Sequence, residues 1–388
     1  MGGKEIMKLI LHIGVPKTGT SAIQLFLWEN RNLLLKKHAI LYPESGSFNV
    51  YIYPYKAHYK IAYSFPTIVS IQASFKKEEI FSSLSEEIRL TEPKAVILSC
   101  ETFSLLKKTE DLYNSLKGLD FEDIYVVVYL RRQDLWFESS YKQVIKTGEY
   151  SGPFNKIPNA THMEVIDYNR LLAKWTTFVP PKNIYIKIYD RRILYKNNVI
   201  DDFCLVLSDI LKDKVDLKTE NYKTANPSFS HLSALVKLRV CQNYVITSAR
   251  EHVEISNYLL TLDKEEGSGP LKTFFTLEER IEFLERFRES NERLFREWFN
   301  SENKFVLTPE EIEFYKEQDK IPKDEIERLV EERYQKVVEN VIKKFEAKPK
   351  VYIPVELSKL VKEGEVVEKV VIDQLYLDLL KGSKLVVG

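Results

Sequence analysis

The sequence predicts an α/β protein: a P-loop-type open parallel sheet flanked by helices, with a helical C-terminal extension. Four short, nearly continuous apolar runs occupy residues 8–13, 95–99, 124–130 and 184–189, as in strands that are buried on both faces. Amphipathic segments alternate with these runs, and the first run ends in a glycine turn that opens a helix. Because ligands bind beyond the carboxyl ends of parallel strands, the residues that follow each run are the first candidates for a site.

The segments between the apolar runs have the periodicity of helices. We expect helices at about residues 20–36, 78–90, 109–117, 132–146 and 167–178.

The character of the sequence changes to helical from about residue 271. Thr276 and Glu279 form a capping box that opens a helix with apolar positions up to Trp298. Thr308 begins a second helix, and a third is expected over roughly residues 323–346.

These patterns divide the chain into three regions. Residues 1–270 form the α/β core, and residues 271–348 form a helical segment that packs on the core or on a partner subunit. Residues 349–388 form an extension of unknown role that is too apolar for a disordered tail.

Composition sets limits on partners and compartment. The 57 basic residues balance the 57 acidic ones, which argues against bulk nucleic-acid binding. The 3 cysteines lie far apart without metal-ligand spacing, as in proteins of a reducing compartment. No apolar run is long enough to span a membrane. We therefore expect a cytoplasmic protein; peripheral membrane contact and homo-oligomer formation through the C-terminal helices stay open.

The first strand-to-helix turn predicts an anion site. Residues 11–24 read LHIGVPKTGTSAIQ, so a glycine turn and a helix N-terminus meet beside an ammonium group and several hydroxyls. Gly14 and Gly19 keep the spacing of a nucleotide-triphosphate loop. The lysine position of that loop holds Thr20, however, and the lysine has moved forward to Lys17. This arrangement suits a single 5′-phosphate and the group that leaves it better than a magnesium-bound triphosphate.

The motif VPKTGTS resembles the 5′-phosphosulfate loop of sulfotransferases that use 3′-phosphoadenosine 5′-phosphosulfate (PAPS), in particular bacterial, carbohydrate sulfotransferase-like members. The resemblance extends over roughly residues 8–300 and implies PAPS as cofactor, without a metal for transfer. It implies that Lys17 stabilises the leaving oxygen. The residues that would bind the 5′-phosphosulfate are Pro16, Lys17, Thr18, Gly19, Thr20 and Ser21.

A second motif of the same family follows the third apolar run. The family holds the 3′-phosphate with an arginine at a strand end and a serine eight residues later on the next helix; Arg131 and Ser139 match this spacing. A guanidinium offers a bidentate fork for a phosphate. Arg132 would take this role if the strand ended one residue later.

Two residues are candidates for the base that removes the acceptor proton. Glu101 follows the second apolar run, where bacterial members of the family often carry a glutamate. It could instead be a helix N-terminal acid. His58 is the rival, in a tyrosine-rich segment that could stack on sugar rings or only cover the sheet. The sequence leaves both assignments open.

The resemblance implies transfer of a sulfuryl group from PAPS to a hydroxyl or amine, of a glycan or glycolipid. Ala22 stands where many relatives have an adenine-stacking tryptophan, so the adenine platform would lie elsewhere, for example in residues 220–230. One alternative is a nucleotide or small-molecule kinase, which would need a lysine at position 20. The other is a non-catalytic nucleotide-binding or interaction protein.

Overall fold

The computed structural model describes residues 7–48, 56–68, 75–154, 165–219 and 228–345. The chain forms two compact units, which are described separately. The units interleave along the chain, whereas the regions expected from the sequence were separated by single boundaries near residues 270 and 348. Unit 1 consists of Met1–Trp136, Asn159–Asn226 and Phe283–Val306, and unit 2 of Phe137–Pro158, Pro227–Glu282 and Leu307–Gly388.

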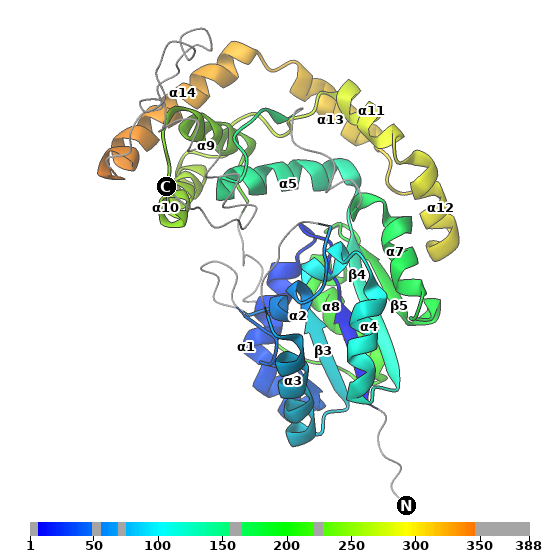
Figure 1. Ribbon diagram of the computed structural model, residues 1–388. Helices are drawn as coiled ribbons and strands as arrows, with labels where there is room; N and C mark the ends of the chain where they lie inside the picture. The colour runs from blue at the N-terminus through cyan, green and yellow to red at the C-terminus, as the bar shows by residue number, and fades with distance from the viewer. Residues whose placement is uncertain (1–6, 49–55, 69–74, 155–164, 220–227, 346–388) are drawn as a thin grey trace, which may run out of the picture. The chain divides into compact units, whose positions relative to one another are not determined.

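Unit 1 contains a five-stranded parallel sheet with the strand order β2-β3-β1-β4-β5 (Figure 1). This confirms the predicted α/β fold and the four predicted strands. The two-residue strand β2 was not expected, because two residues carry no periodicity. The strands are β1 (Lys8–His12), β2 (Ile40–Leu41), β3 (Ala95–Ser99), β4 (Asp123–Leu130) and β5 (Ile184–Ile188).

Helices α1 (Thr20–His38) and α8 (Val199–Leu211) pack against one face of the sheet. Phe26 and Phe203 of these helices belong to one buried apolar cluster with Ile10 of β1. In Figure 1, α4 lies in front of the strands and α8 behind them, so the sheet is covered on both faces, as its apolar strands require. The other α-helices of unit 1 are α2 (Tyr59–Tyr63), α3 (Lys77–Thr91), α4 (Thr109–Leu116), α7 (Tyr168–Thr176) and α12 (Arg288–Phe299).

Unit 2 is helical, and α5 (Gln133–Thr147) begins in unit 1 and continues into it. Its apolar cluster includes Val236, Leu259 and Val337. Its further helices among the described residues are α9 (His231–Asn243), α10 (Ala249–Glu265), α11 (Leu277–Glu285), α13 (Pro309–Asp319) and α14 (Lys323–Asn340), of which α11 ends in unit 1.

The C-terminal helices begin where their caps predict, but the first of them is broken. Thr276 and Thr308 each form the expected reciprocal cap, with Glu279 and Glu311. The single helix predicted up to Trp298 is wrong, because α11 ends and α12 begins around Phe287. Apolar side chains are buried on both sides of this turn, so their spacing did not reveal it. Residues 349–388 lie outside the described part of the chain.

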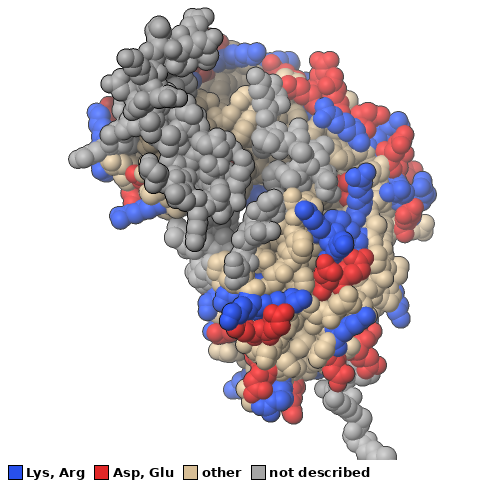
Figure 2. All heavy atoms as spheres, in the orientation of Figure 1, with Lys and Arg blue, Asp and Glu red and all other residues tan. Residues whose placement is uncertain are grey.

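Basic and acidic side chains are both exposed on the described part of the chain (Figure 2). On the face in Figure 2, basic and acidic side chains are interspersed, and neither sign gathers into a large patch. The three cysteines are buried and unbridged. Among the described residues, no helix is both long and apolar enough to cross a membrane.

Candidate functional site

The order in which the strands are added reverses at the central strand β1: β2 and β3 lie on one side of it, and β4 and β5 lie on the other. β1 pairs with β3 on one side and with β4 on the other. His12 at its carboxyl end lies opposite Ser99 of β3 and Val127 of β4. The segments after these three strands carry the predicted loop, Glu101 and Arg131. They meet at a topological switch point, the usual ligand position of an open α/β sheet.

The loop between β1 and α1 depends on two glycines with positive φ. Gly14 has φ 37° and Gly19 has φ 82°. A Cβ atom on Gly14 would lie 2.8 Å from Thr20 Oγ1, and one on Gly19 would lie 2.8 Å from Tyr189 Cε2. Neither position accommodates a side chain without a shift of its neighbours. Lys17 at the apex also has a left-handed backbone, with φ 68°.

Three consecutive carbonyl groups of this loop accept hydrogen bonds from side chains. Because the carbonyls are engaged, the loop keeps a curvature in which successive amide groups can point toward an anion. The first amides of α1 add to this, since helix geometry leaves them without an intrahelical acceptor. The pairs are Val15 O with Thr18 Oγ1 (2.6 Å), Pro16 O with Trp136 Nε1 (2.6 Å) and Lys17 O with Arg131 Nη1 (3.1 Å).

The hydroxyls of Thr18 and Thr20, expected to point toward a bound phosphate, instead point toward the backbone of the loop. Thr18 and Thr20 both donate to the carbonyl of Val15, and both side chains are buried. A hydroxyl has one hydrogen, so an anion in this loop would be bound mainly by backbone amides and Lys17. Ser21 is half-buried in the first turn of α1.

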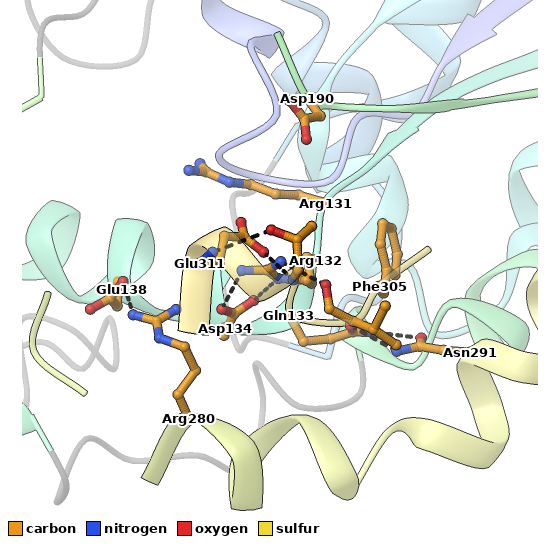
Figure 3. A network of polar contacts seen from close by, with 12 residues as sticks. Arg131, Arg132, Gln133, Asp134, Glu138, Asp190, Arg280, Asn291, Phe305 and Glu311 are labelled. Carbon is orange, nitrogen blue, oxygen red and sulfur yellow. Dashed lines mark hydrogen bonds and ion pairs between the residues drawn. The ribbon is translucent and has the colours of Figure 1, made fainter. Parts of the chain in front are cut away.

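Arg131 and Arg132 have separate environments (Figure 3). The guanidinium of Arg131 donates to the loop, and its Cζ lies 5.7 Å from the centre of the Tyr189 ring. Arg132 is buried and forms a bidentate pair with Asp134, at 2.7 and 3.0 Å. The Arg132 guanidinium is therefore already paired with the Asp134 carboxylate, so Arg131 remains the candidate ligand for a 3′-phosphate.

The backbone of Arg131 is anchored by a tyrosine. The hydroxyl of Tyr168 on α7 donates to the Arg131 carbonyl. Tyr168 is buried, and burial raises the pKa of its hydroxyl, which therefore stays protonated and able to donate. Ser139 lies on α5 within unit 2, so its pairing with Arg131 stays a prediction.

Glu101 lies directly against the loop, because a Cβ atom on Gly14 would be 3.5 Å from its Cα. It is the first residue of a short 3₁₀ helix, Glu101–Leu105. Its Oε1 accepts a hydrogen bond from the Tyr59 hydroxyl, and its Oε2 accepts one from Gln24 Nε2 at 2.9 Å. The carboxylate is thus half-buried beside the loop and held at both oxygens.

His58 has a different environment. It is fully buried, and its Nε2 lies 3.1 Å from the Pro43 carbonyl while its Nδ1 accepts from the Ser99 amide at 3.0 Å. Burial lowers its pKa to about 4, which keeps the ring neutral with the proton on Nε2. Since both ring nitrogens bind the backbone, His58 anchors α2 to the end of β3.

Some of the features predicted from the sequence lie outside the described residues. Residues 220–227 of the expected adenine platform are not described, nor are the tyrosines at positions 51, 53 and 55. The described residues contain no cluster of three or more His, Cys, Asp or Glu side chains arranged for a metal ion. Gln24 and Trp136 had no assigned role from the sequence, and Tyr59 was considered only as one of the aromatic residues around His58; their contacts across the fold reveal all three.

The fold and site define an α/β protein with a glycine-turn loop at the switch point of a parallel sheet. No family model matches the chain, and no solved structure matches it. A protein of Archaeoglobus fulgidus, described as an uncharacterized protein, is 44% identical over 294 residues, which cover 76% of this chain and 78% of that protein. The chain belongs to the same family as this archaeal protein.

Proposed function

We propose that the protein is a PAPS-dependent sulfotransferase that moves a sulfuryl group to a hydroxyl or amine, of a glycan or glycolipid. The observation that carries the proposal is the hydrogen bond between Arg131 Nη1 and the carbonyl of Lys17. This hydrogen bond joins the loop motif and the arginine motif, whose bonded residues are 114 positions apart in sequence, at the carboxyl ends of β1 and β4. β1 and β4 are paired in the sheet, so their carboxyl ends lie side by side, and the two motifs meet there.

The loop has the features of a site for one phosphate group. Gly14 packs against Thr20, and Gly19 packs against Tyr189, so the tight turn of the loop depends on the absence of a side chain at both positions. The positive end of the α1 dipole and the Lys17 ammonium supply positive charge. When bound, PAPS supplies the activated sulfuryl group.

Charge stabilisation and proton removal fall to different residues of the chain. Lys17 would stabilise negative charge that develops on the bridging oxygen of the leaving phosphate. Glu101 would accept the proton of the attacking hydroxyl or amine. A bond forms between the acceptor atom and sulfur, and the bond between sulfur and the bridging oxygen breaks. The products are the sulfated acceptor and adenosine 3′,5′-bisphosphate (PAP).

Ligand binding to the wild-type protein tests the proposal. We expect PAP and PAPS to bind with EDTA present, measured by calorimetry and thermal shift. A ligand at one hundred times its Kd should stabilise the fold by about 2.7 kcal/mol. ATP with magnesium is the matched comparison, since a kinase would require it. Tight, magnesium-dependent ATP binding without PAP binding would contradict the proposal, and binding of neither nucleotide would favour a non-nucleotide function.

A further inference from the structure

The Glu101 carboxylate is fixed by two side chains from separate elements. Tyr59, the first residue of α2, donates its hydroxyl to Oε1. Gln24, in the second turn of α1, donates its Nε2 to Oε2 at 2.9 Å. Tyr59 is 6% exposed and Gln24 is 0% exposed, so water competes little for either hydrogen bond.

We infer that Tyr59 and Gln24 are positioning residues that aim the Glu101 carboxylate at the acceptor of the transferred group. The inference rests on the proposed function. A carboxylate oxygen accepts two hydrogen bonds, so one donor on each oxygen leaves each of them a further acceptor position. The carboxylate can therefore receive a proton while it is held in one orientation.

The surroundings of Tyr59 keep its hydroxyl in place. The preceding residue, His58, is bonded to the ends of two neighbouring segments through Pro43 and Ser99. The Tyr59 ring packs edge-on against the Phe48 ring, with 5.9 Å between the ring centres, and stacks on the Tyr63 ring, with 5.6 Å between the ring centres. Ring packing and backbone anchoring together leave the hydroxyl little freedom to leave Glu101.

Gln24 couples the carboxylate to the loop. It lies four residues after Thr20, one turn along the helix whose N-terminus forms part of the loop. Helix α1 therefore contributes its first residues to the loop and, through Gln24, a hydrogen bond to Glu101.

The effect of losing one donor is predicted from catalytic geometry. Small misplacements of a catalytic group can cost up to about 10²-fold in rate. We expect Tyr59→Phe and Gln24→Met each to lower the rate of sulfuryl transfer by about 10- to 10²-fold. PAP affinity should stay close to that of the wild type, because neither side chain belongs to the loop.

Transfer to water is the probe, because it needs no knowledge of the natural acceptor. The full-length protein is mixed with PAPS in a single turnover, and formation of PAP is followed by chromatography. Tyr63→Phe is the matched control: it removes a hydroxyl from the neighbouring ring of the same helix, and we expect no change. In a Glu101→Gln background, Tyr59→Phe should cause no further loss, since a residue that acts through Glu101 has no effect without it.

A spectroscopic measurement tests the hydrogen bond between Tyr59 and Glu101 without any catalytic turnover. In protein labelled with ¹³C-glutamate, the infrared difference between wild type and Glu101→Gln isolates the carboxylate band of Glu101. Tyr59→Phe should shift this band, and Tyr63→Phe should leave it in place.

Two results would overturn the inference: an unshifted band in Tyr59→Phe, or a full additional rate loss in the Glu101→Gln background. Failure of the proposed function looks different, since wild-type protein would then bind neither PAP nor PAPS while the band shift persisted.

Discussion

The two arginines that follow β4 have different partners although they are adjacent in sequence. Arg131 contacts the loop, whereas Arg132 is buried in a bidentate pair with Asp134. The sequence pattern admitted both residues as phosphate ligands. The difference arises because Asp134 pairs with Nε and Nη2 of Arg132, whereas the guanidinium of Arg131 donates to the Lys17 carbonyl.

Removal of Arg131 should affect one ligand and spare another. We expect Arg131→Ala to weaken PAP binding by about tenfold or more, because a charge-assisted hydrogen bond to the 3′-phosphate is lost. Adenosine 5′-phosphosulfate lacks this phosphate and should bind nearly as before, as measured by calorimetry. Arg170→Ala, an exposed arginine on α7, is the control. Equal losses for the two ligands would mean that Arg131 only shapes the loop through Lys17.

At the scale of elements, the loop before α1 depends on backbone conformation more than on side chains. Its three engaged carbonyls and two glycines with positive φ define its curvature. Such a loop tolerates exchange of exposed side chains but not the addition of a Cβ atom at a glycine.

Three glycine-to-alanine substitutions separate the causes of this intolerance. Gly118→Ala meets no atom within 4 Å and has no positive φ, so its stability should not fall. Gly267→Ala also meets no atom but has φ 84°, and should cost about 1–2 kcal/mol. Gly19→Ala combines φ 82° with a 2.8 Å approach to Tyr189, so it should cost more. Denaturant unfolding gives the three values, and equal costs for Gly19 and Gly267 would show that the loop relaxes freely.

The elements that could be predicted from sequence are those with a strong local signal. The four main strands are mostly apolar because both faces of the sheet are covered, and Thr276 and Thr308 fix helix starts through reciprocal caps. The turn between α11 and α12 has no such signal. Phe287, which ends the break, is as buried as a helical core residue would be.

The site was predictable in part for the same reason. The loop and Arg131 lie in short motifs, whereas the contacts of Glu101 join residues 77 and 42 positions away in sequence. Nothing local distinguishes Gln24 from any other helical glutamine, or Tyr59 from the tyrosines around it. Only the pairing of distant segments gives these two side chains a role.

At the scale of the whole molecule, burial of histidines links stability to pH. All five described histidines have a pKa below the ordinary value of 6.5, with burial as the main cause. The fully or largely buried ones are His12 (about 3), His58 (about 4), His231 (about 2) and His252 (about 3).

Folding stability should therefore fall as the pH falls below about 6.5. The unfolded chain binds protons there while the folded chain does not, so the stabilisation is complete above pH 6.5 and is lost toward the folded pKa. Between about pH 7.5 and pH 5, each such histidine should contribute a loss of up to about 2 kcal/mol. Thermal unfolding at both pH values measures this. His58→Gln should show a smaller difference between them, and an unchanged difference would mean that His58 titrates normally.

The interleaving of the two units has a consequence for how the protein is synthesised. Unit 1 ends with Phe283–Val306, so two of the three segments of unit 2 are synthesised before unit 1 is complete. This late segment supplies Asn291, which exchanges hydrogen bonds with Gln133, and Ser290, which accepts two from Asn169. Unit 1 is therefore complete only after α12 has been synthesised, in contrast to chains whose N-terminal domain folds first. Fragments cut near residue 270 should be translated without ever completing unit 1.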